Sequence, residues 1–172
     1  LSYAEAMEMA VFGAKSIHPR ALEPVAEAGI PVRVKNTFNE ESPGTLISSS
    51  TKPGGSVVKA VALVKDVGMI TVSGAGMVGR PGTAAKIFDV LGKGGVNILM
   101  ISQSASEANI TILVRRGLLH RAVSILEIAL LGGGVIGEVV CEDDVCAIAA
   151  IGAGMKGTPG VAAKIFQAVA DK

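Results

Sequence analysis

A glycine-rich stretch is the part of the chain best suited to bind a small molecule. It runs from Gly74 to Gly82, between an apolar segment and a helical pattern. Glycine gives such a stretch backbone freedom and leaves its N–H groups accessible. The N–H groups at the start of a helix have no partner within the helix, so they can bind a carboxylate or a phosphate. A tight turn without a ligand is the alternative interpretation.

Gln103 is the polar side chain that most specifically suggests a ligand. It follows a predicted apolar strand, 96–102, and lies near the glycine-rich stretch if the two strands around that stretch are neighbours. Its amide can donate and accept hydrogen bonds at once, which suits a hydroxyl group or the polar groups of an amino acid. A solvated amide at the end of a strand is the alternative. Asn97 could bind a ligand or cap the turn before it.

Two familiar glycine motifs fit this stretch poorly. A P-loop would continue with Gly-Lys-Ser/Thr, and this sequence does not. The spacing of Gly74, Gly76 and Gly79 does match a dinucleotide-binding fingerprint. That fold also needs an acidic residue at the end of the next strand, where this chain has residues 97–99, Asn-Ile-Leu. We therefore expect a small amino acid rather than a nucleotide at this position.

The elements around the stretch predict a ferredoxin-like α/β (α+β) fold. In chain order they are strand 69–73, the glycine-rich stretch, a helix that begins with Pro81 in its first turn, strands 96–102 and 109–115, helix 118–130 and strand 135–141. The order βαββαβ is typical of that fold. The charged run 142–144 is expected to be a turn, followed by an apolar strand at 145–151.

The N-terminal part predicts short helices and strands. Ser2 and Glu5 have the spacing of a capping box at the start of the first helix. Residues 36–56 are rich in Ser, Thr, Pro, Gly and Asn, which predicts a domain boundary. His18 precedes Pro19 and is expected to pack or to cap a helix. The expected elements are helices 3–13 and 20–28 and strands 30–35, 43–47 and 57–65.

The glycine-rich stretch occurs twice. Residues 152–166 repeat residues 74–88, and most positions are identical. Self-similarity of this extent indicates two copies of one structural unit. The second copy continues only to Lys172, and a βα pair cannot bury its apolar face alone. We therefore expect an incomplete second unit, in a sequence that is part of a longer one.

The composition is that of a globular chain and argues against several functions. Of 172 residues, 49% are hydrophobic and 18% are charged, with a net charge of +1. Balanced charge and few aromatic residues do not favour nucleic acid, and no apolar stretch reaches the length of a membrane span. Cys141 and Cys146 have no histidine nearby to complete a zinc site, so we expect no metal site. Two unpaired cysteines fit a reducing, cytoplasmic location.

Three segments of the chain resemble aspartate kinases. Residues 1–47 contain Gly-Ala-Lys-Ser-Ile-His-Pro-Arg and close with Pro-Gly-Thr-Leu-Ile, like the end of the catalytic domain of that family. Residues 69–114 resemble its first regulatory ACT domain, and residues 147–166 resemble the start of the second. The resemblance implies a catalytic-domain tail of amino-acid-kinase type at 1–50, a first ACT domain at 67–141, and a partial second ACT domain made of 57–66 and 142–172.

This resemblance implies a parent enzyme that transfers the γ-phosphoryl group of ATP to aspartate with the help of Mg²⁺. Lys15 matches the lysine that lies at the nucleotide site in the family. The glycine-rich kinase motif and the aspartate-binding residues of the family have no counterpart in this sequence. Because phosphoryl transfer requires nucleotide, metal and acceptor to be positioned together, we expect no catalytic residue, no cofactor and no activity in the chain itself.

The resemblance also implies a regulatory ligand. The ACT domains of this family bind end-product amino acids and inhibit the kinase. Residues 100–103, Met-Ile-Ser-Gln, resemble the threonine-sensitive enzymes, including those fused to homoserine dehydrogenase, and the glutamine of that motif maps to Gln103. Lysine-sensitive relatives often have an acidic residue where this chain has Ile98-Leu99-Met100. A buried ammonium group without a partner is costly, so threonine is expected and lysine is the alternative.

The family pattern gives a set of expected effector-binding residues and a partner. ACT units of two subunits pair edge to edge, so a homodimer is expected. A ligand-free dimerisation module and an ACT regulator of another pathway enzyme are the remaining alternatives. The expected effector-binding residues are Met77, Val78, Gly79, Pro81, Gly82, Asn97, Ile98 and Gln103.

Overall fold

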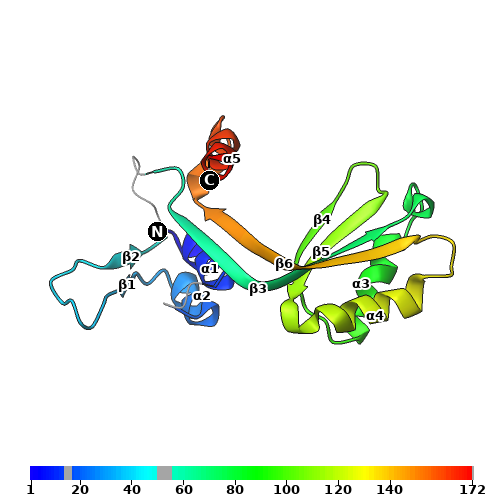
Figure 1. Cartoon of the computed structure of the whole chain (residues 1–172). Coiled ribbons are helices and arrows are strands. Elements are labelled where there is room, and N and C mark those ends of the chain that lie inside the picture. Colours follow the sequence, from blue (N-terminus) through cyan, green and yellow to red (C-terminus); the bar gives the residue numbers. More distant parts are fainter. Residues whose placement is uncertain (14–16, 50–55, 172) are drawn as a thin grey trace. The chain divides into compact units, whose positions relative to one another are not determined.

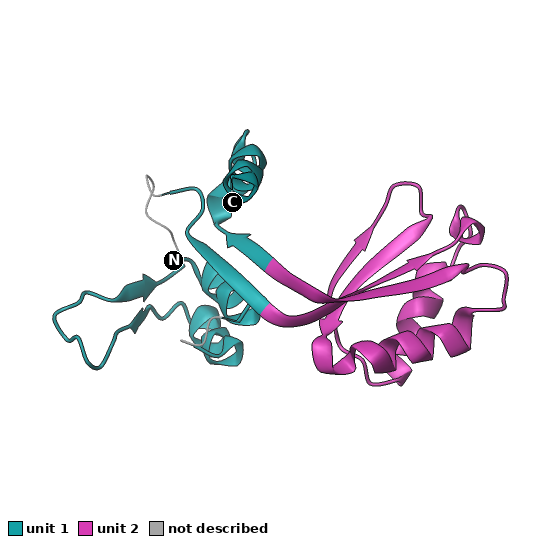
Figure 2. Ribbon diagram, viewed as in Figure 1, with its two compact units in different colours: residues 1–64, 148–172 teal, residues 65–147 magenta. Residues whose placement is uncertain are grey.

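The chain divides into two compact units, each with its own hydrophobic core. The structure, a computed structural model, describes residues 1–13, 17–49 and 56–171. Residues 65–147 form one unit, and residues 1–64 together with 148–172 form the other (Figure 2). A separate core in each unit is typical of independently packed domains.

The unit of residues 65–147 is a sheet with two helices on one face (Figure 1). The strand order is β4-β5-β3-β6, with β5 antiparallel to both of its neighbours. This strand order and the order βαββαβ along the chain confirm the predicted ferredoxin-like fold. The elements are β3 (Ala60–Ser73), α3 (Thr83–Lys93), β4 (Ile98–Gln103), β5 (Asn109–Arg115), α4 (Leu119–Leu130) and β6 (Glu138–Ile151), with short 3₁₀ helices η1 (Ala75–Met77) and η2 (Arg116–Leu118).

Alternating side chains on β5 build the core of this unit. Ile110 and Ile112 are buried, and they belong to one core cluster with Ile87 and Leu91 of α3. Thr111 lies on the opposite face, where its Oγ1 is 3.2 Å from Oγ1 of a threonine on β3. Because α3 packs through residues spaced by one helical turn, its first turn is held beside the glycine-rich stretch.

Strand β4 is an edge of this sheet and exposes apolar side chains. Leu99, Met100 and Ile101 are 37%, 46% and 51% exposed. The pairing of β4 with β5 has an irregularity between Ile98 and Met100. An apolar edge strand presents unpaired backbone groups to any further strand, so this edge is open to association.

The predicted breaks in the two long strands are wrong. Residues 57–65 and 69–73 were predicted as separate strands, but β3 runs without a break from Ala60 to Ser73. Likewise the predicted turn at 142–144 lies within the continuous strand β6. The charged side chains there are exposed to solvent, so an extended backbone costs them no hydration and their charges do not force a turn.

The other unit begins with the predicted pair of helices. Ser2 and Glu5 form the predicted capping box on the first of them. Tyr3, Ala6, Leu22 and Ile47 form its buried core. The elements of this unit are α1 (Tyr3–Val11), α2 (Pro19–Glu27), the antiparallel pair β1 (Val32–Val34) and β2 (Thr45–Ile47), parts of β3 and β6, the 3₁₀ helix η3 (Ala153–Met155), and α5 (Val161–Ala170).

The boundaries of the compact units differ in one respect from the predicted domains. Residues 1–50 were predicted as the tail of a catalytic domain, apart from the partial second ACT domain, and residues 1–64 cluster here with residues 148–172 in one compact unit. The transitions at 64–65 and 147–148 lie a few residues from the predicted ones. The assignment of 1–50 to the tail of a catalytic domain stays a prediction.

The repeat seen in the sequence is also a repeat of hydrogen bonds. The N–H of Gly137 donates to the carbonyl of Ser73 at 2.8 Å, and the N–H of Lys59 donates to the carbonyl of Ile151 at 2.7 Å. The first bond lies in the unit of residues 65–147, and the second is its counterpart in the other unit. Each bond joins the residue just before one long strand to the last residue of the other long strand. The structural repeat therefore includes the residues just before β3 and β6, which lie outside the repeated sequence 74–88 and 152–166.

Candidate functional site

The glycine corner, defined as residues 74–82, connects β3 to α3. Gly82 is the N-cap of α3, with φ of 85°, and it offers no side chain to the free N–H groups of the first turn. The predicted position of Pro81 in that first turn is wrong, because α3 begins at Thr83. The corner instead uses Pro81 just outside the helix, where a fixed φ stiffens the approach to it.

The glycines of the corner fall into two pairs with different structural roles. A Cβ at Gly74 or Gly76 would collide with the backbone of Val135, so these two positions serve packing of the chain on itself. Gly79 and Gly82 have φ of 63° and 85°, with open space where a Cβ would lie. Both of these residues also line a hollow, so this half of the corner is the part that can meet a ligand.

A hollow of about 320 Å³ lies beside this half of the corner. Met77 and Ile110, both almost fully buried, line it with apolar surface. Gln103, at the end of β4, also lines it, although β4 and β3 are not neighbours as the sequence suggested, since β5 lies between them in the sheet. The hollow is lined by Met77, Gly79, Arg80, Pro81, Gly82, Thr83, Ala84, Gln103, Glu107 and Ile110.

The structure brings five of the eight expected effector-binding residues to this hollow. Met77, Gly79, Pro81, Gly82 and Gln103 line it. Val78, by contrast, is 54% exposed and is not part of the lining. Asn97 and Ile98 lie at the opposite end of β4 from Gln103, about 15–20 Å along the strand. Whether these residues contact an effector stays a prediction.

Gln103 has a free amide at the edge of the hollow. It is exposed, and its side chain makes no hydrogen bond to any residue that the structure describes. An unoccupied amide can donate to a carboxylate and accept from a hydroxyl or an ammonium group without breaking an internal contact. This is the state expected of a ligand-binding side chain before its ligand arrives.

Glu107 is a lining residue that the sequence alone did not single out. Its Oε2 accepts a hydrogen bond from the backbone N–H of Gly79 at 3.0 Å. Its own N–H donates to the carbonyl of Ser104 at 3.0 Å, which closes a turn between β4 and β5. The sequence signal was the acidic residue at the end of the Ser-rich segment 104–107.

The hollow has charges of both signs. Arg80 and Glu107 line it, and neither forms an ion pair within the described part of the chain. A free amino acid carries one carboxylate and one ammonium group, so a site with a cation, an anion and free N–H groups is complementary to it. The apolar lining from Met77 and Ile110 would accept the aliphatic part of the same ligand.

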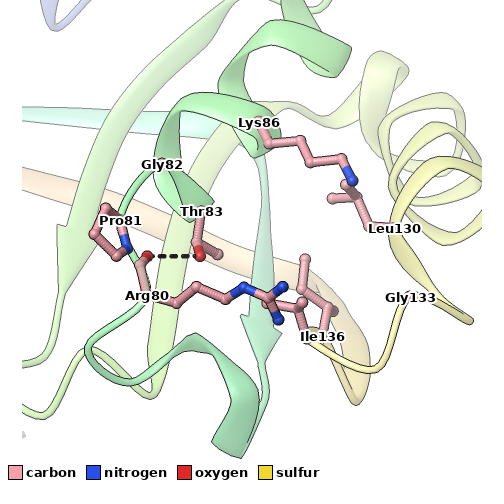
Figure 3. A pocket seen from close by; sticks show the side chains of 9 residues that line it. Arg80, Pro81, Gly82, Thr83, Lys86, Leu130, Gly133 and Ile136 are labelled. Atoms are coloured by element: carbon pink, nitrogen blue, oxygen red, sulfur yellow. Dashed lines mark hydrogen bonds between the residues drawn. The ribbon is translucent and has the colours of Figure 1, made fainter.

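A second hollow of about 240 Å³ shares the segment 80–83 with the first and is otherwise lined by Lys86 and residues of the segment 130–136 (Figure 3). Arg80 and Lys86 flank it, and Thr83 Oγ1 donates to the carbonyl of Arg80 at 3.0 Å. A hollow at the equivalent place follows the second corner and is lined by Thr158, Lys164 and Val57. Since it recurs with the repeat, this hollow is a feature of the corner fold.

The remaining candidate residues lie away from the hollow or outside the described chain. Lys15, the expected nucleotide-binding residue, lies outside the described residues. His18 caps α2, because its Nδ1 accepts from the N–H of Arg20 at 3.2 Å. Cys141 and Cys146 are free and exposed. Among the described residues, no group of three or more His, Cys, Asp or Glu could hold a metal ion, and no helix is long and apolar enough to cross a membrane.

The fold and the paired corners agree with a known family. The family model described as ACT domain matches residues 70–130 and 148–172, which include both glycine corners. The chain belongs to the ACT domain family. The matched residues fall in both compact units, as the internal repeat requires.

Aspartate kinases are among the proteins most similar to this ACT-domain chain. The bifunctional aspartokinase/homoserine dehydrogenase of Daucus carota, a chloroplastic protein, is 38% identical over 180 residues, covering 99% of this chain and 20% of the relative. The protein of the same name from Haemophilus influenzae is 36% identical over 173 residues, covering 99% and 21%. The chain spans about a fifth of the length of these relatives. The resemblance to aspartate kinases is thus confirmed.

Solved aspartate kinases are similar to this chain over most or all of its length. The enzyme of Clostridium acetobutylicum superposes with a TM-score of 0.88 and 26% identity, over 100% of this chain and 40% of that one. Aspartokinase III of E. coli in complex with lysine and aspartate gives a TM-score of 0.73 and 26% identity, over 97% and 37%. The fold of this chain is therefore similar to part of the fold of solved aspartate kinases.

Proposed function

We propose that the chain is a regulatory region of an aspartate kinase and that it senses threonine. The observation that carries the proposal is the hollow beside the glycine corner, which is lined by the uncapped first turn of α3, by Gln103, by two opposite charges and by apolar side chains. A threonine zwitterion could place its carboxylate at the corner and its hydroxyl at the Gln103 amide. An effector bound there inhibits only if the hollow fits it better in the inhibited arrangement than in the active one.

Two observations favour threonine over lysine: the absence of charge at the start of β4 and the type of enzyme found among the relatives. The residues at 98–100 are Ile-Leu-Met and carry no charge to receive the terminal ammonium of lysine. The relatives are bifunctional aspartokinase/homoserine dehydrogenases, the type that the Met-Ile-Ser-Gln motif resembles.

Lysine is a second candidate because of Glu107. This carboxylate lines the hollow and could receive an ammonium group, which weakens the argument from β4 alone. E. coli aspartokinase III, a structural relative, was solved with lysine. Direct titration of the chain with each amino acid distinguishes the two candidate effectors.

The parent enzyme of this proposal is an ATP-dependent kinase that phosphorylates aspartate. It requires Mg²⁺, and Lys15 is the residue of this chain assigned to the nucleotide. E. coli aspartokinase III has been solved with aspartate and ADP, which supports the choice of nucleotide. The chain itself is proposed to be inactive and cytoplasmic, and to pair as a homodimer through the apolar edge of β4.

Thermal melting with and without amino acids tests this function. Threonine is expected to raise the melting temperature of the chain, and lysine and aspartate to leave it unchanged, because a ligand stabilises only the state that binds it. Gln103→Ala is expected to abolish the shift. Gln167→Ala is the matched control, since Gln167 lies on α5 and its side-chain amide donates to Asp171, the C-cap of the same helix. Equal melting shifts in wild type and Gln103→Ala would contradict the proposed site.

A further inference from the structure

One internal contact closes part of the proposed effector site. Gly79 and Glu107 both line the hollow, and the carboxylate of Glu107 accepts a hydrogen bond from the N–H of Gly79 at 3.0 Å. Gly79 and Glu107 lie on different elements, the corner after β3 and the turn after β4. A carboxylate from the protein itself thus uses a donor that an amino-acid carboxylate would use.

The backbone of Glu107 is held in an unfavourable conformation. Its φ is 58°, and no other non-glycine residue of the described chain has positive φ. The left-handed region is uncommon for residues with a Cβ, and glutamate is not among the residue types that favour it. Strained residues persist where surrounding contacts compensate for them. The compensating contacts here are the hydrogen bonds of Glu107 to Gly79 and Ser104.

The turn around Glu107 is built from weak, exposed contacts. Ser104 Oγ and Ser106 Oγ lie 2.9 Å apart, and Glu107 and Ser106 are exposed. No apolar side chain of residues 104–107 belongs to the core cluster. The turn can therefore change conformation without disturbing the packing of β4, β5 and α3.

From these contacts we infer that Glu107 is a built-in competitor of the effector. The inference rests on the proposed function, because it takes an amino acid as the ligand of the hollow. The carboxylate of Glu107 holds the Gly79 N–H in the ligand-free chain, and the effector carboxylate displaces it. Displacement releases the strained backbone, so occupancy of the hollow changes the turn that joins β4 to β5. Glu107 sets how tightly an effector must bind before the turn responds.

Substitutions of Glu107 distinguish two roles for this residue, which either competes with the effector or helps to bind it. Glu107→Asn removes the reach and charge of the side chain, and asparagine tolerates positive φ. Glu107→Gln keeps the length and an acceptor oxygen but loses the charge. Glu127→Asn is the control, because Glu127 is an exposed glutamate on α4, away from the hollow. Threonine and lysine are titrated into each protein by calorimetry, and amide exchange of Gly79 is followed without ligand.

The expected result is tighter binding after the competitor is removed. Glu107→Asn should bind threonine about tenfold more tightly than wild type, as expected when a charge-assisted hydrogen bond no longer has to be broken. Glu107→Gln should bind with an intermediate constant, and Glu127→Asn like wild type. The Gly79 amide should exchange faster in Glu107→Asn. Binding by Glu107→Asn alone, with none by wild type, would support the same inference.

Two other results would overturn the inference. Binding by wild type with equal or weaker binding by Glu107→Asn would show that Glu107 helps to hold the ligand, and the proposed function would stand. Absence of binding of both amino acids to wild type and to every variant would overturn the proposed function and the inference together.

Discussion

Glu5 accepts a hydrogen bond from the backbone N–H of Ala153 at 2.8 Å, across 148 residues of sequence. Its other carboxylate oxygen accepts from the N–H of Ser2, also at 2.8 Å. Only 2% of Glu5 is exposed. One buried carboxylate thus caps α1 and joins it to the second glycine corner, residues 152–160, within the same compact unit.

Removal of this carboxylate is expected to destabilise that unit. Glu5→Ala leaves the N–H of Ala153 without its side-chain partner and removes the capping box, so the free energy of unfolding should fall by about 1–3 kcal/mol. Urea denaturation measures the loss. Glu8→Ala, an exposed position on the same helix, is the control and should stay within about 0.5 kcal/mol of wild type. Equal effects of the two substitutions would contradict the structural role of Glu5.

The same contact predicts how stability depends on pH. Burial alone would raise the pKa of Glu5, but the hydrogen bonds from Ala153 and Ser2 outweigh it and bring the pKa below the ordinary value of 4.5. A carboxylate with a depressed folded-state pKa contributes stability above its unfolded pKa, and that contribution is lost as pH falls through the folded pKa. Stability should therefore fall below about pH 4.5. Denaturation of Glu5→Gln across pH 3–7 should show a smaller fall.

The local elements of the chain were largely predictable because their signals are local. The capping box of Ser2 and Glu5, the end of the helix before Gly94, and the alternation along β5 each follow from a few neighbouring residues. The continuity of β6 through the charged run 142–144 was not predictable in this way. It depends on solvent exposure of both faces of the strand there, which is a property of the tertiary structure.

Gly74 and Gly79 should respond differently to alanine. Gly74→Ala places a Cβ against the backbone of Val135 and Gly137, which cannot move cheaply, so the loss of stability should be about 2–3 kcal/mol or more. Gly79→Ala meets open space and adds only the strain of a positive φ, about 1–2 kcal/mol. Thermal unfolding of the two variants checks the order. A larger loss for Gly79→Ala would show that the Gly74 corner relaxes easily.

The apolar edge of β4 should determine association of the chain. Ile101 is 51% exposed on this edge, so Ile101→Lys should leave the fold intact and place a charge where a second chain would pair. Sedimentation should show a dimer for wild type and a monomer for this variant. Ile128→Lys is the matched control, since Ile128 is 85% exposed on α4. A dimer that survives Ile101→Lys would place the contact elsewhere.

The candidate site was predictable only in part, for a similar reason. Gln103 and the glycine corner stand out because their residue types suit ligand binding at strand ends. Glu107 did not stand out, because its role depends on a hydrogen bond to Gly79, 28 residues away. Gly74 and Gly76 belonged to the same motif as Gly79, yet only tertiary contacts with Val135 reveal that they serve packing.

Calorimetric titration of the chain with threonine and with lysine tests the central claim most directly. The account predicts saturable binding of threonine, weaker or no binding of lysine, and loss of threonine binding in Gln103→Ala but not in Gln167→Ala. The Gln103 amide should matter because it lines the hollow and makes no bond to any described residue. Tight binding of lysine with no response to threonine would contradict the assigned effector. Unchanged threonine binding in Gln103→Ala would contradict the assigned site.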